Sequence, residues 1–553
     1  MISISLSNVT LILGARLIFE SLSWEIQHDQ RIGLIGPNGA GKSSLFKLIV
    51  GEYSSEAGGG VTYAKGISIG YLAQDPELDL IQTAYASALD GNPRHAEIEL
   101  ALQAIETSLS EAETYQNPKR LSRTLEAQQS LLEEYESLGG SQYAKRAREL
   151  LLGLGLPEND LDKPLGALSG GQKKLVGLAR LLIRRPGVLL LDEPDNHLDL
   201  PGKAYLERLI RDYPGAVVIV SHDRYLLDAA VSHIAEIEDG KLFTFTGDYS
   251  SYIIDKEQRL ARQDELYRVQ QRQIQRMEEA IKRLALWGKI YDNEKFAKRA
   301  EAIRKRLDRM DKIDRPILER RRMDLQLNGW RGSNKVLEIV ALWKSFGQGG
   351  LINNLNQVIR HGERVGLIGP NGSGKSVLLR LILSLEQSDR GEIILGPSVK
   401  VGYYAQEHET LNFDQTLIEA VRYAGKLSES AAVAFLLRYL FTYQQASQKI
   451  RHLSGGERSR LQLALLVLSG ANFLLLDEPT NNLDIISAEV LEVALADFVG
   501  TVLVVSHDRY FLDRTVDRIL ELKNGSLTEF PGGYSDYLVA SRRSALVTAP
   551  MPE

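Results

Sequence analysis

A stretch of fourteen residues occurs twice in this chain and constrains its fold more than any other feature. Residues 31–44 read RIGLIGPNGAGKSS and residues 364–377 read RVGLIGPNGSGKSV. In each copy a short apolar run precedes a Gly-rich turn that ends in Lys-Ser, and a second apolar run follows. This is the pattern of a strand, a phosphate-binding loop and a helix. Two copies in the same context predict two α/β domains of the P-loop type, one in each half of the chain.

The phosphate-binding loops supply the first candidate nucleotide-binding residues. Their glycines let the backbone N–H groups face the phosphates, and the helix that follows adds partial positive charge. Lys42 and Lys375 are expected to reach the β- and γ-phosphates, while the hydroxyls of Ser43 and Ser376 can bind Mg²⁺. The candidates are Gly36, Pro37, Asn38, Gly39, Ala40, Gly41, Lys42, Ser43 and Ser44 in the first half, and Gly369, Pro370, Asn371, Gly372, Ser373, Gly374, Lys375, Ser376 and Val377 in the second.

Other motifs recur at a different spacing. Tyr71–Gln74 and Tyr403–Gln406 are 332 residues apart, whereas LSGGQ at Leu168–Gln172 and LSGGE at Leu453–Glu457 are 285 apart. The motifs LLLDEP and SHDRY also recur at a spacing of 285. One duplication explains all of these repeats if the first half has about 47 extra residues between its Gln and its LSGG.

The extra residues are predicted to form a helical arm at about residues 94–138. Apolar residues recur there at helical spacing, Asn117-Pro118 breaks the pattern in two, and Gly139-Gly140 ends it. The arm is acidic, with four basic residues against nine carboxylates. Packing on its own domain and contact with a partner are equally compatible with this pattern.

Each half also has an apolar Leu-Leu-Leu strand that ends in two carboxylates, Asp192-Glu193 in the first half and Asp477-Glu478 in the second. A carboxylate at a buried strand end beside a phosphate-binding loop suits Mg²⁺ coordination, which assigns Asp192 and Asp477 to the metal. The next carboxylate is placed to accept a proton from an attacking water. Glu193 and Glu478 are therefore the candidate catalytic bases.

The stretch between the halves differs from the rest of the chain in charge. Residues 253–323 carry 21 Lys+Arg against 13 Asp+Glu, a net of +8, so the remainder of a chain with net charge −6 totals −14. Apolar residues step through this stretch in heptads up to Leu284, and a second helical run follows until Arg315-Pro316. The pattern predicts an antiparallel helical hairpin with its tip near Trp287–Lys295.

The hairpin could contact RNA. Ten of its basic residues could neutralise phosphates, and Trp287, Tyr291 and Phe296 near the tip could stack on bases. A solvated, charged coiled coil with core aromatics is the alternative. The charge contrast favours RNA, with Phe296 as a core residue and Trp287 as the better contact candidate. The basic residues are Lys282, Arg283, Lys289, Lys295, Lys298, Arg299, Arg304, Lys305, Arg306 and Arg309.

Composition narrows the class of protein. The 553 residues include no cysteine, which excludes disulfides, thiolate metal sites and iron–sulfur clusters and favours a cytoplasmic location. A hydrophobic content of 44% and a charged content of 25% are typical of a soluble globular protein. The sequence shows neither a signal peptide nor an apolar run long enough to span a membrane, so a partner chain would have to supply any span.

Taken together, these residues resemble the nucleotide-binding domains of the ABC ATPase superfamily. LSGGQ and LSGGE match its signature motif, which caps the γ-phosphate bound on the opposite domain. The resemblance implies ATP hydrolysis at two composite sites, with Gln74 and Gln406 near the metal and His222 and His507 on the γ-phosphate. One site joins Lys42, Ser43, Gln74, Asp192, Glu193 and His222 with Ser454, Gly455 and Gly456. The other joins Lys375, Ser376, Gln406, Asp477, Glu478 and His507 with Ser169, Gly170 and Gly171. The last residues of the signature motifs, Gln172 and Glu457, are further nucleotide-binding candidates.

Two departures from the family pattern are expected to make the sites unequal while leaving both active. The family often has an aromatic residue under the adenine; Phe346 fits in the second half, but Leu13 stands at the comparable place in the first. The usual DEPTN occurs once, whereas the first half has Asp195 in place of the Thr. This extra carboxylate is expected to perturb turnover at the site of the first half.

The chain is similar to the ABC-F family in particular. Two ATP domains are joined by a charged linker, and each half has an acidic motif followed by Asn-X-Leu-Asp, a SHDRY motif and a closing Tyr-containing turn. The resemblance implies binding to the ribosome at the tRNA exit site, with the hairpin reaching large-subunit rRNA and tRNA. It also implies a role in translation or in protecting the ribosome from antibiotics. Two ATP molecules would hold the halves together, and hydrolysis would release the protein.

Three other functions remain open from sequence. A tandem ATPase subunit of a membrane importer would require membrane partners, and its linker would normally be short. A DNA-associated ABC ATPase usually has much longer coiled coils or zinc modules. A scaffold that binds ATP without hydrolysing it conflicts with the intact Glu193 and Glu478.

The expected fold is therefore α/β, with two P-loop ABC-type domains joined by an antiparallel helical hairpin. The first domain covers residues 1–252, the hairpin 253–333 and the second domain 334–540. Residues 541–553 are expected to be a disordered tail.

Overall fold

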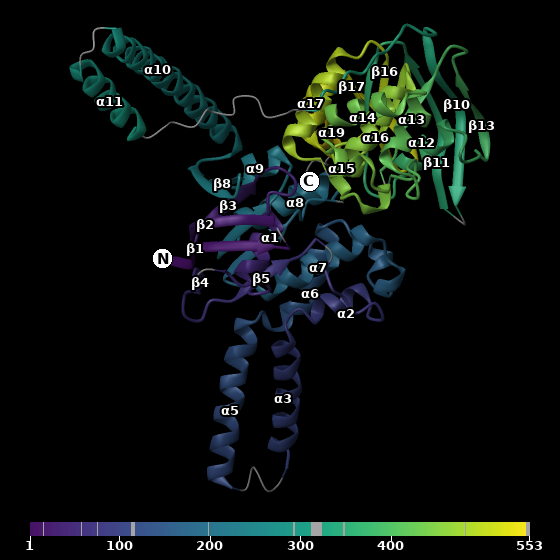
Figure 1. Cartoon of the computed structure of the whole chain (residues 1–553). Coiled ribbons are helices and arrows are strands. Elements are labelled where there is room, and N and C mark those ends of the chain that lie inside the picture. Colours follow the sequence, from purple (N-terminus) through teal and green to yellow (C-terminus); the bar gives the residue numbers. More distant parts are fainter. Residues whose placement is uncertain are drawn as a thin grey trace. The chain divides into compact units, whose positions relative to one another are not determined.

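A computed structural model describes residues 1–14, 16–56, 58–74, 76–111, 117–196, 198–290, 294–310, 323–346, 349–406, 408–481 and 483–548. The chain forms two compact units. The first combines Met1–Asp248 with Met323–Glu553, and the second is Tyr249–Arg322. The first unit contains both ATPase-like halves, and the second contains the helices of the hairpin (Figure 1).

The first half is built on a mostly parallel sheet. Its strands and those of a smaller antiparallel sheet are β1 (Ile2–Leu13), β2 (Arg16–Gln27), β3 (Arg31–Ile35), β4 (Gly60–Tyr63), β5 (Ile69–Leu72), β6 (Val188–Asp192), β7 (Ala216–Val220), β8 (His233–Glu238) and β9 (Lys241–Thr246). The large sheet has the order β5-β6-β7-β3-β8-β9, with β9 antiparallel to its neighbour, and the small one β2-β1-β4. Strands β6 and β7 are buried at every residue, which explains their unbroken apolar runs.

The helices of the first half include the arm. They are α1 (Lys42–Ile49), α2 (Ala84–Leu89), α3 (Pro93–Leu109), α5 (Pro118–Ser137), α6 (Tyr143–Gly153), α7 (Gly170–Arg184), α8 (Leu200–Arg211) and α9 (Arg224–Ala230). Helices α3 and α5 lie side by side as the arm (Figure 1). No residue of α5 is buried, and the guanidinium of Arg94 binds both carboxylate oxygens of Glu134 at 2.8 and 2.9 Å. The two arm helices therefore pack mainly on each other.

The second half repeats this plan. Its strands are β10 (Lys335–Phe346), β11 (Gly349–Arg360), β12 (Arg364–Ile368), β13 (Arg390–Leu395), β14 (Val401–Tyr404), β15 (Phe473–Asp477), β16 (Thr501–Val505), β17 (Arg518–Lys523) and β18 (Ser526–Pro531). Its helices are α12 (Lys375–Ile382), α13 (Leu417–Gly425), α14 (Glu429–Arg438), α15 (Tyr443–Ala446), α16 (Gly455–Ser469), α17 (Ile485–Asp497), α18 (Arg509–Thr515) and α19 (Tyr534–Thr548). The strand orders β14-β15-β16-β12-β17-β18 and β11-β10-β13 match those of the first half.

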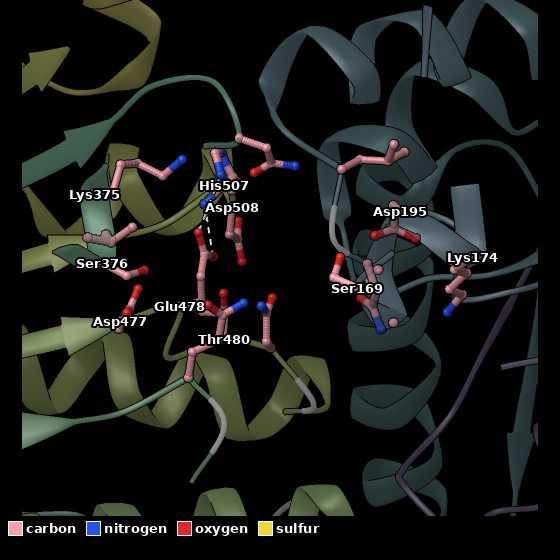
Figure 2. A pocket seen from close by; sticks show the side chains of 18 of the residues that line it. Ser169, Lys174, Asp195, Lys375, Ser376, Asp477, Glu478, Thr480, His507 and Asp508 are labelled. Carbon is pink, nitrogen blue, oxygen red and sulfur yellow. Dashed lines mark hydrogen bonds and ion pairs between the residues drawn. The ribbon is translucent and has the colours of Figure 1, made fainter. Parts of the chain in front are cut away.

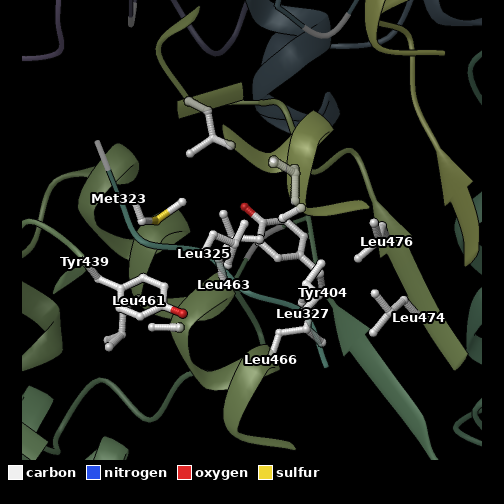
Figure 3. Packing of buried hydrophobic residues seen from close by; sticks show 14 of the residues in the cluster. Met323, Leu325, Leu327, Tyr404, Tyr439, Leu461, Leu463, Leu466, Leu474 and Leu476 are labelled. Atoms are coloured by element: carbon white, nitrogen blue, oxygen red, sulfur yellow. The ribbon is translucent and has the colours of Figure 1, made fainter. Parts of the chain in front are cut away.

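The segment that follows the hairpin belongs to the core of the second half. Met323, Leu325 and Leu327 are each less than 10% exposed and pack in the cluster that contains Tyr404 and Tyr439 (Figure 3). The apolar residues at alternating positions explain why this short irregular stretch is buried. The linker was predicted to extend to residue 333, but the residues from Met323 onwards already belong to the second half.

The hairpin consists of two helices, α10 (Tyr249–Ile290) and α11 (Glu294–Asp308), which pack on each other. Ile281 and Ala300 are buried between them, and the other heptad positions from Leu260 to Leu284 are half-buried. The basic side chains named above that the structure describes are exposed. The side chain of Lys289, all of Tyr291 and the predicted helix end at Arg315-Pro316 lie outside the described residues.

The aromatic residues near the hairpin tip lie against each other. The rings of Trp287 and Phe296 are 5.9 Å apart and nearly perpendicular, and the Arg283 guanidinium lies 5.6 Å from the Trp287 ring. Trp287 nevertheless remains 40% exposed, whereas Phe296 is half-buried. Both aromatics thus contribute to the packing of the hairpin, and Trp287 keeps a free surface.

The predicted α/β class, with two P-loop domains joined by a helical hairpin, is confirmed. The C-terminal end differs from expectation, because α19 continues to Thr548 through a segment predicted to be disordered from Ser541. Residues 549–553 lie outside the described residues.

Candidate functional site

A cavity of about 900 Å³ lies among candidate residues from both halves. Ser169, Lys174 and Asp195 of the first half face Lys375, Ser376 and Glu478 of the second across this space (Figure 2). A volume of this size is sufficient for a ligand as large as a nucleotide. The cavity brings together every residue of one predicted composite site, namely Lys375, Ser376, Gln406, Asp477, Glu478, His507, Ser169, Gly170, Gly171 and Gln172. We call this set the Lys375 site.

The other composite set, which we call the Lys42 site, contributes fewer residues to this cavity. Of its members, Gln74, His222 and Gly455 line the same cavity. Its phosphate-binding loop is linked to the second half by the N–H of Asn38, which donates to Asp484 Oδ2 at 3.3 Å.

The phosphate-binding loops have the same backbone geometry in both halves. Gly36 has φ 151° and Gly369 has φ 156°, and a Cβ atom would lie 2.6 Å from the carbonyl oxygen of Ile237 or 2.3 Å from that of Leu522. Only glycine fits at these close approaches. Each loop then curls around its lysine. Lys42 Nζ donates to Gly36 O at 2.8 Å and Lys375 Nζ to Gly369 O at 2.8 Å, which places each ammonium against its own loop.

Both lysines are largely buried, and burial lowers the pKa of Lys42 and of Lys375. The carboxylates of Glu193 and Glu478 act in the opposite direction. Anionic phosphates would compensate the ammonium groups in the same way as these carboxylates do.

The aspartates at the strand ends fit a divalent cation. Asp192 and Asp477 are each 2% exposed, and Asp192 Oδ2 and Asp477 Oδ1 have no hydrogen-bond partner among the described residues. Burial raises the pKa of Asp192 and brings that of Asp477 to about 6, while hydrogen bonds with Ser43 and Ser376 oppose the shift. Within the described ranges no group of three or more His, Cys, Asp or Glu side chains could hold a metal. A cation here would need the hydroxyl, the carboxylate and substrate oxygens together.

The two candidate bases have a constrained backbone and different partners. Glu193 has φ 50° and Glu478 φ 49°, left-handed values that cost a non-glycine residue of the order of 1 kcal/mol. Asn196 Nδ2 donates to Glu193 Oε2 at 2.7 Å, whereas the N–H of His507 donates to Glu478 Oε2 at 3.2 Å. Burial raises the pKa of Glu193 and brings that of Glu478 to about 7. Glu478 can therefore accept a proton near neutral pH, and the pKa of Glu193 shifts in the same direction.

Each candidate histidine lies beside its glutamate. His222 Nε2 is 3.7 Å from Glu193 Oε1, and His507 Nε2 is 3.6 Å from Glu478 Oε1. The ring nitrogens have no hydrogen-bond partner among the described residues. Burial lowers the pKa of His222 to about 3 and that of His507 well below its ordinary value. The rings are thus neutral and can donate one hydrogen bond to a ligand.

The signature motifs form helix N-termini. Ser169 and Ser454 are the N-caps of α7 and α16, and each forms a capping box with the third residue of its helix. Gln172 and Glu457 therefore hydrogen-bond to the cap residues, although the sequence grouped them with the nucleotide-binding residues. These boxes fix the Gly-Gly turns whose N–H groups begin the helices.

The remaining candidates have distinct positions. Gln406 is half-buried and Gln74 exposed, and both line the cavity. Phe346 is 53% exposed, with the Lys344 ammonium 4.9 Å from its ring, whereas Leu13 packs against the apolar core of the first half. Phe346 therefore offers an open ring face, and the first half offers none at the comparable place.

Sequence reasoning did not identify the aspartates of the two Asn-X-Leu-Asp segments as functional. Asp199 caps α8 through Oδ1 and, through Oδ2, accepts from the N–H of Asn371 in the opposite loop at 3.2 Å. Asp484 does the same for α17 and Asn38, at 2.9 and 3.3 Å. Their recurrence 285 residues apart was a usable signal.

Sequence reasoning also assigned no role to the arginines of the SHDRY motifs. Arg224 forms a buried ion pair with Glu492, and Arg509 forms a largely buried one with Glu207, so each pair joins the two halves. Arg224 also stacks on Tyr510, with 3.9 Å between the guanidinium carbon and the ring centroid. The residue types alone did not show that their partners lie in the other half.

Comparison with known proteins agrees with this geometry. Two family profiles, both described as ABC transporter, match residues 19–196 with 352–481 and residues 235–327. The energy-dependent translational throttle protein EttA of Escherichia coli K12 is 35% identical over 96% of this chain and 94% of its own length. The putative ATP-binding protein YdiF of Bacillus subtilis is 36% identical over 95% of this chain and 80% of its own length.

Other similarities extend the comparison. ABC transporter F family member 5 of Arabidopsis thaliana is 32% identical over 94% of this chain and 75% of its own length. The archaeal ribosome recycling factor aABCE1, in complex with stalk protein aP1, has the same fold, with a TM-score of 0.61 at 19% identity. That structure covers 97% of this chain, and this chain covers 92% of it.

The paired P-loop domains, their signature motifs and their acidic strand ends define a tandem ABC ATPase, which binds and hydrolyses ATP. Its relatives and the family profile that matches residues 235–327 identify the family within this class. The chain belongs to the ABC-F family. In the part of the chain that the structure describes, no helix is long and apolar enough to cross a membrane.

Proposed function

We propose that this ABC-F ATPase binds the ribosome near the tRNA exit site and acts in translation. The exposed basic hairpin α10–α11 is the observation that carries the proposal, in a chain that covers 94% of a translational throttle protein. The family resemblance supplies the location at the exit site. The charge of the hairpin suits the phosphates of large-subunit rRNA and tRNA.

Each ATP is proposed to bind between a phosphate-binding loop and the opposite signature motif. Lys42 and Lys375 hold the β- and γ-phosphates, and the N-termini of α7 and α16 face the γ-phosphate from the other half. Mg²⁺ would be held by Ser43, Gln74 and Asp192 at one site, and by Ser376, Gln406 and Asp477 at the other. When bound, it neutralises charge that develops on the phosphates.

Hydrolysis is proposed to use Glu193 and Glu478 as bases. Each takes a proton from the attacking water, while the neutral ring of His222 or His507 donates a hydrogen bond to the γ-phosphate. Loss of that phosphate removes the anion that links the two halves. The halves then loosen, and the hairpin loses its ribosome-binding geometry.

The test is a double variant, Glu193→Gln with Glu478→Gln, which binds ATP but lacks both bases. With ATP, it is expected to sediment with ribosomes in greater amount than the native protein does. A density map of that complex would then show whether the hairpin reaches rRNA and tRNA near the exit site. Sedimentation equal to that of the native protein would refute the proposal.

The control is the same double variant without nucleotide. Because ATP is proposed to hold the halves together, this sample should sediment with ribosomes no more than native protein does. Ribosome binding that does not depend on ATP would show that the hairpin binds whether or not ATP holds the halves together, and would contradict the proposed coupling of ATP binding to ribosome binding.

A further inference from the structure

A buried lysine connects the first half to the catalytic loop of the second. Lys203 lies in the first turn of α8 and is 8% exposed. Its ammonium donates to Asp223 Oδ2 at 2.9 Å and to the backbone carbonyl of His507 at 2.9 Å. His507 follows β16 and lies beside the candidate base Glu478. One ammonium therefore bridges the two halves at the Lys375 site.

Carboxylates around Lys203 keep it charged in this buried position. Burial by itself lowers the pKa of Lys203, but Asp223, Asp195 and Asp508 more than offset this, so that the pKa is raised. Asp195 is itself 5% exposed and interacts with Lys203. Asp195, which stands where the family usually has Thr, thus occurs together with the cation Lys203. Asp195 and Lys203 both line the cavity of the Lys375 site.

The duplicated half lacks this pair. At the 285-residue spacing, Thr480 corresponds to Asp195 and Ala488 to Lys203. Alanine has no donor, so the second half cannot make the reciprocal contact with His222. The flanking interactions are symmetric, since Asp199 and Asp484 make equivalent contacts with the opposite loops. The asymmetry is therefore local to one charged pair.

A single residue, His507, connects Lys203 to the candidate base Glu478. The N–H of His507 donates to Glu478 Oε2 at 3.2 Å, while Lys203 holds the carbonyl of the same residue. At the Lys42 site, Glu193 instead accepts from Asn196 of its own half. The orientation of Glu478 thus depends on a residue held from the opposite half, and that of Glu193 does not.

We propose that Lys203, paired with Asp223, is a positioning residue that makes hydrolysis at the Lys375 site depend on closure of the halves. In this role it acts through the backbone carbonyl of His507. The Lys42 site hydrolyses ATP without such a contact. The two sites are consequently unequal, because Lys203 of the first half acts on the site whose phosphate-binding loop belongs to the second half.

The test compares Lys203→Ala in two backgrounds. Glu193→Gln leaves turnover to the Lys375 site, and Glu478→Gln leaves it to the Lys42 site. Lys203→Ala should lower kcat about tenfold in the first background with KM for ATP nearly unchanged, and less than twofold in the second. Lys203→Arg, which can still donate to the carbonyl, should restore most of the lost kcat.

Two further variants guard against a general effect on folding. Asp195→Thr with Lys203→Ala copies the residues of the second half and leaves Asp223 with the Arg509 guanidinium 3.5 Å away, and it should show the same selective loss. Arg208→Ala removes an exposed cation from the same helix and should change neither site. Equal losses in both backgrounds, or no loss with Glu193→Gln, would overturn the proposal.

The assignment of Glu193 and Glu478 as catalytic bases can be wrong while the proposal for Lys203 holds. If neither Glu→Gln change lowers hydrolysis in the otherwise native chain, the assignment of the bases is wrong. Lys203→Ala is then judged in the native chain by kcat at saturating ATP. A decrease restored by Lys203→Arg supports the positioning role, and an unchanged kcat refutes it.

Discussion

The carboxylate of Asp199 reaches the phosphate-binding loop of the opposite half, where Oδ2 accepts a hydrogen bond from the N–H of Asn371 at 3.2 Å. Its other oxygen caps α8 at 3.0 Å. One side chain therefore ties the start of a helix to the loop that would hold the phosphates of the other half. Asp484 and Asn38 repeat the arrangement. The phosphate-binding loop of each half is thus hydrogen-bonded to the residue that caps a helix in the other half.

Replacement of Asp199 or Asp484 by alanine is expected to reduce both stability and ATPase activity. Loss of the N-cap costs about 1 kcal/mol of unfolding free energy, and loss of the contact between halves lowers kcat. Asp199→Asn keeps one acceptor oxygen, so it can retain one of the two hydrogen bonds and should be milder than alanine. Ser428→Ala removes a cap from α14 alone and should lower stability without changing kcat. Urea denaturation and ATPase assays measure the two effects. An Asp199→Ala protein with native kcat would contradict this role.

The buried pairs between halves predict a strong effect on stability. Arg224→Ala leaves Glu492 buried without its cation, at a cost of about 3–5 kcal/mol, and Arg509→Ala removes the cation from the half-buried Glu207 at a smaller cost. Chemical denaturation should show this as a lower midpoint or as separate unfolding of the halves. Arg94→Ala, which breaks the exposed pair with Glu134 in the arm, is the matched control and should have little effect. Similar shifts for buried and exposed pairs would argue against the interface.

The glycine at the start of each phosphate-binding loop should not tolerate a side chain. In Gly36→Ala the new Cβ would meet the carbonyl of Ile237 at 2.6 Å, in a backbone conformation that L-residues rarely adopt. ATP binding at that loop should be lost, as measured with a fluorescent ATP analogue in a Gly36→Ala, Gly369→Ala double variant. Gly60→Ala has open space around its Cβ and should bind normally. Native affinity in the double variant would show that the loop geometry differs in solution.

Charge on the hairpin should set the salt dependence of ribosome binding. Each of Lys298, Arg299 and Arg304 that contacts a phosphate contributes about one unit to the slope of log K against log salt. Changing the three to Gln should therefore make the slope shallower as well as weaken binding. Lys65→Gln with Lys145→Gln removes exposed charge outside the hairpin and is the control. If the hairpin variant and the control variant changed the slope equally, the hairpin would not be the part of the protein that binds ribosomal phosphates.

Much of the fold could be predicted because duplicated motifs carry strong local constraints. The strand, loop and helix around Lys42 and Lys375 follow from apolar runs and glycines, and the heptads of α10 follow from their spacing. The extent of the linker could not be predicted. The alternating apolar residues of Met323–Leu327 are too few to identify the half to which they belong, and only packing against Tyr404 and Tyr439 assigns them to the second half.

For the sites, the sequence determined which residues handle phosphates, since these act through local backbone geometry and through residue types at fixed spacing. The family resemblance implied that each signature motif meets the opposite phosphate-binding loop, but the tertiary structure decided which other residues meet across the halves. Asp195 was expected to disturb its own half, yet it lies with Lys203 beside the catalytic loop of the other. Residues separated by 304 positions leave no pattern in sequence, because a hydrogen bond between them depends on the packing of two domains and not on local spacing.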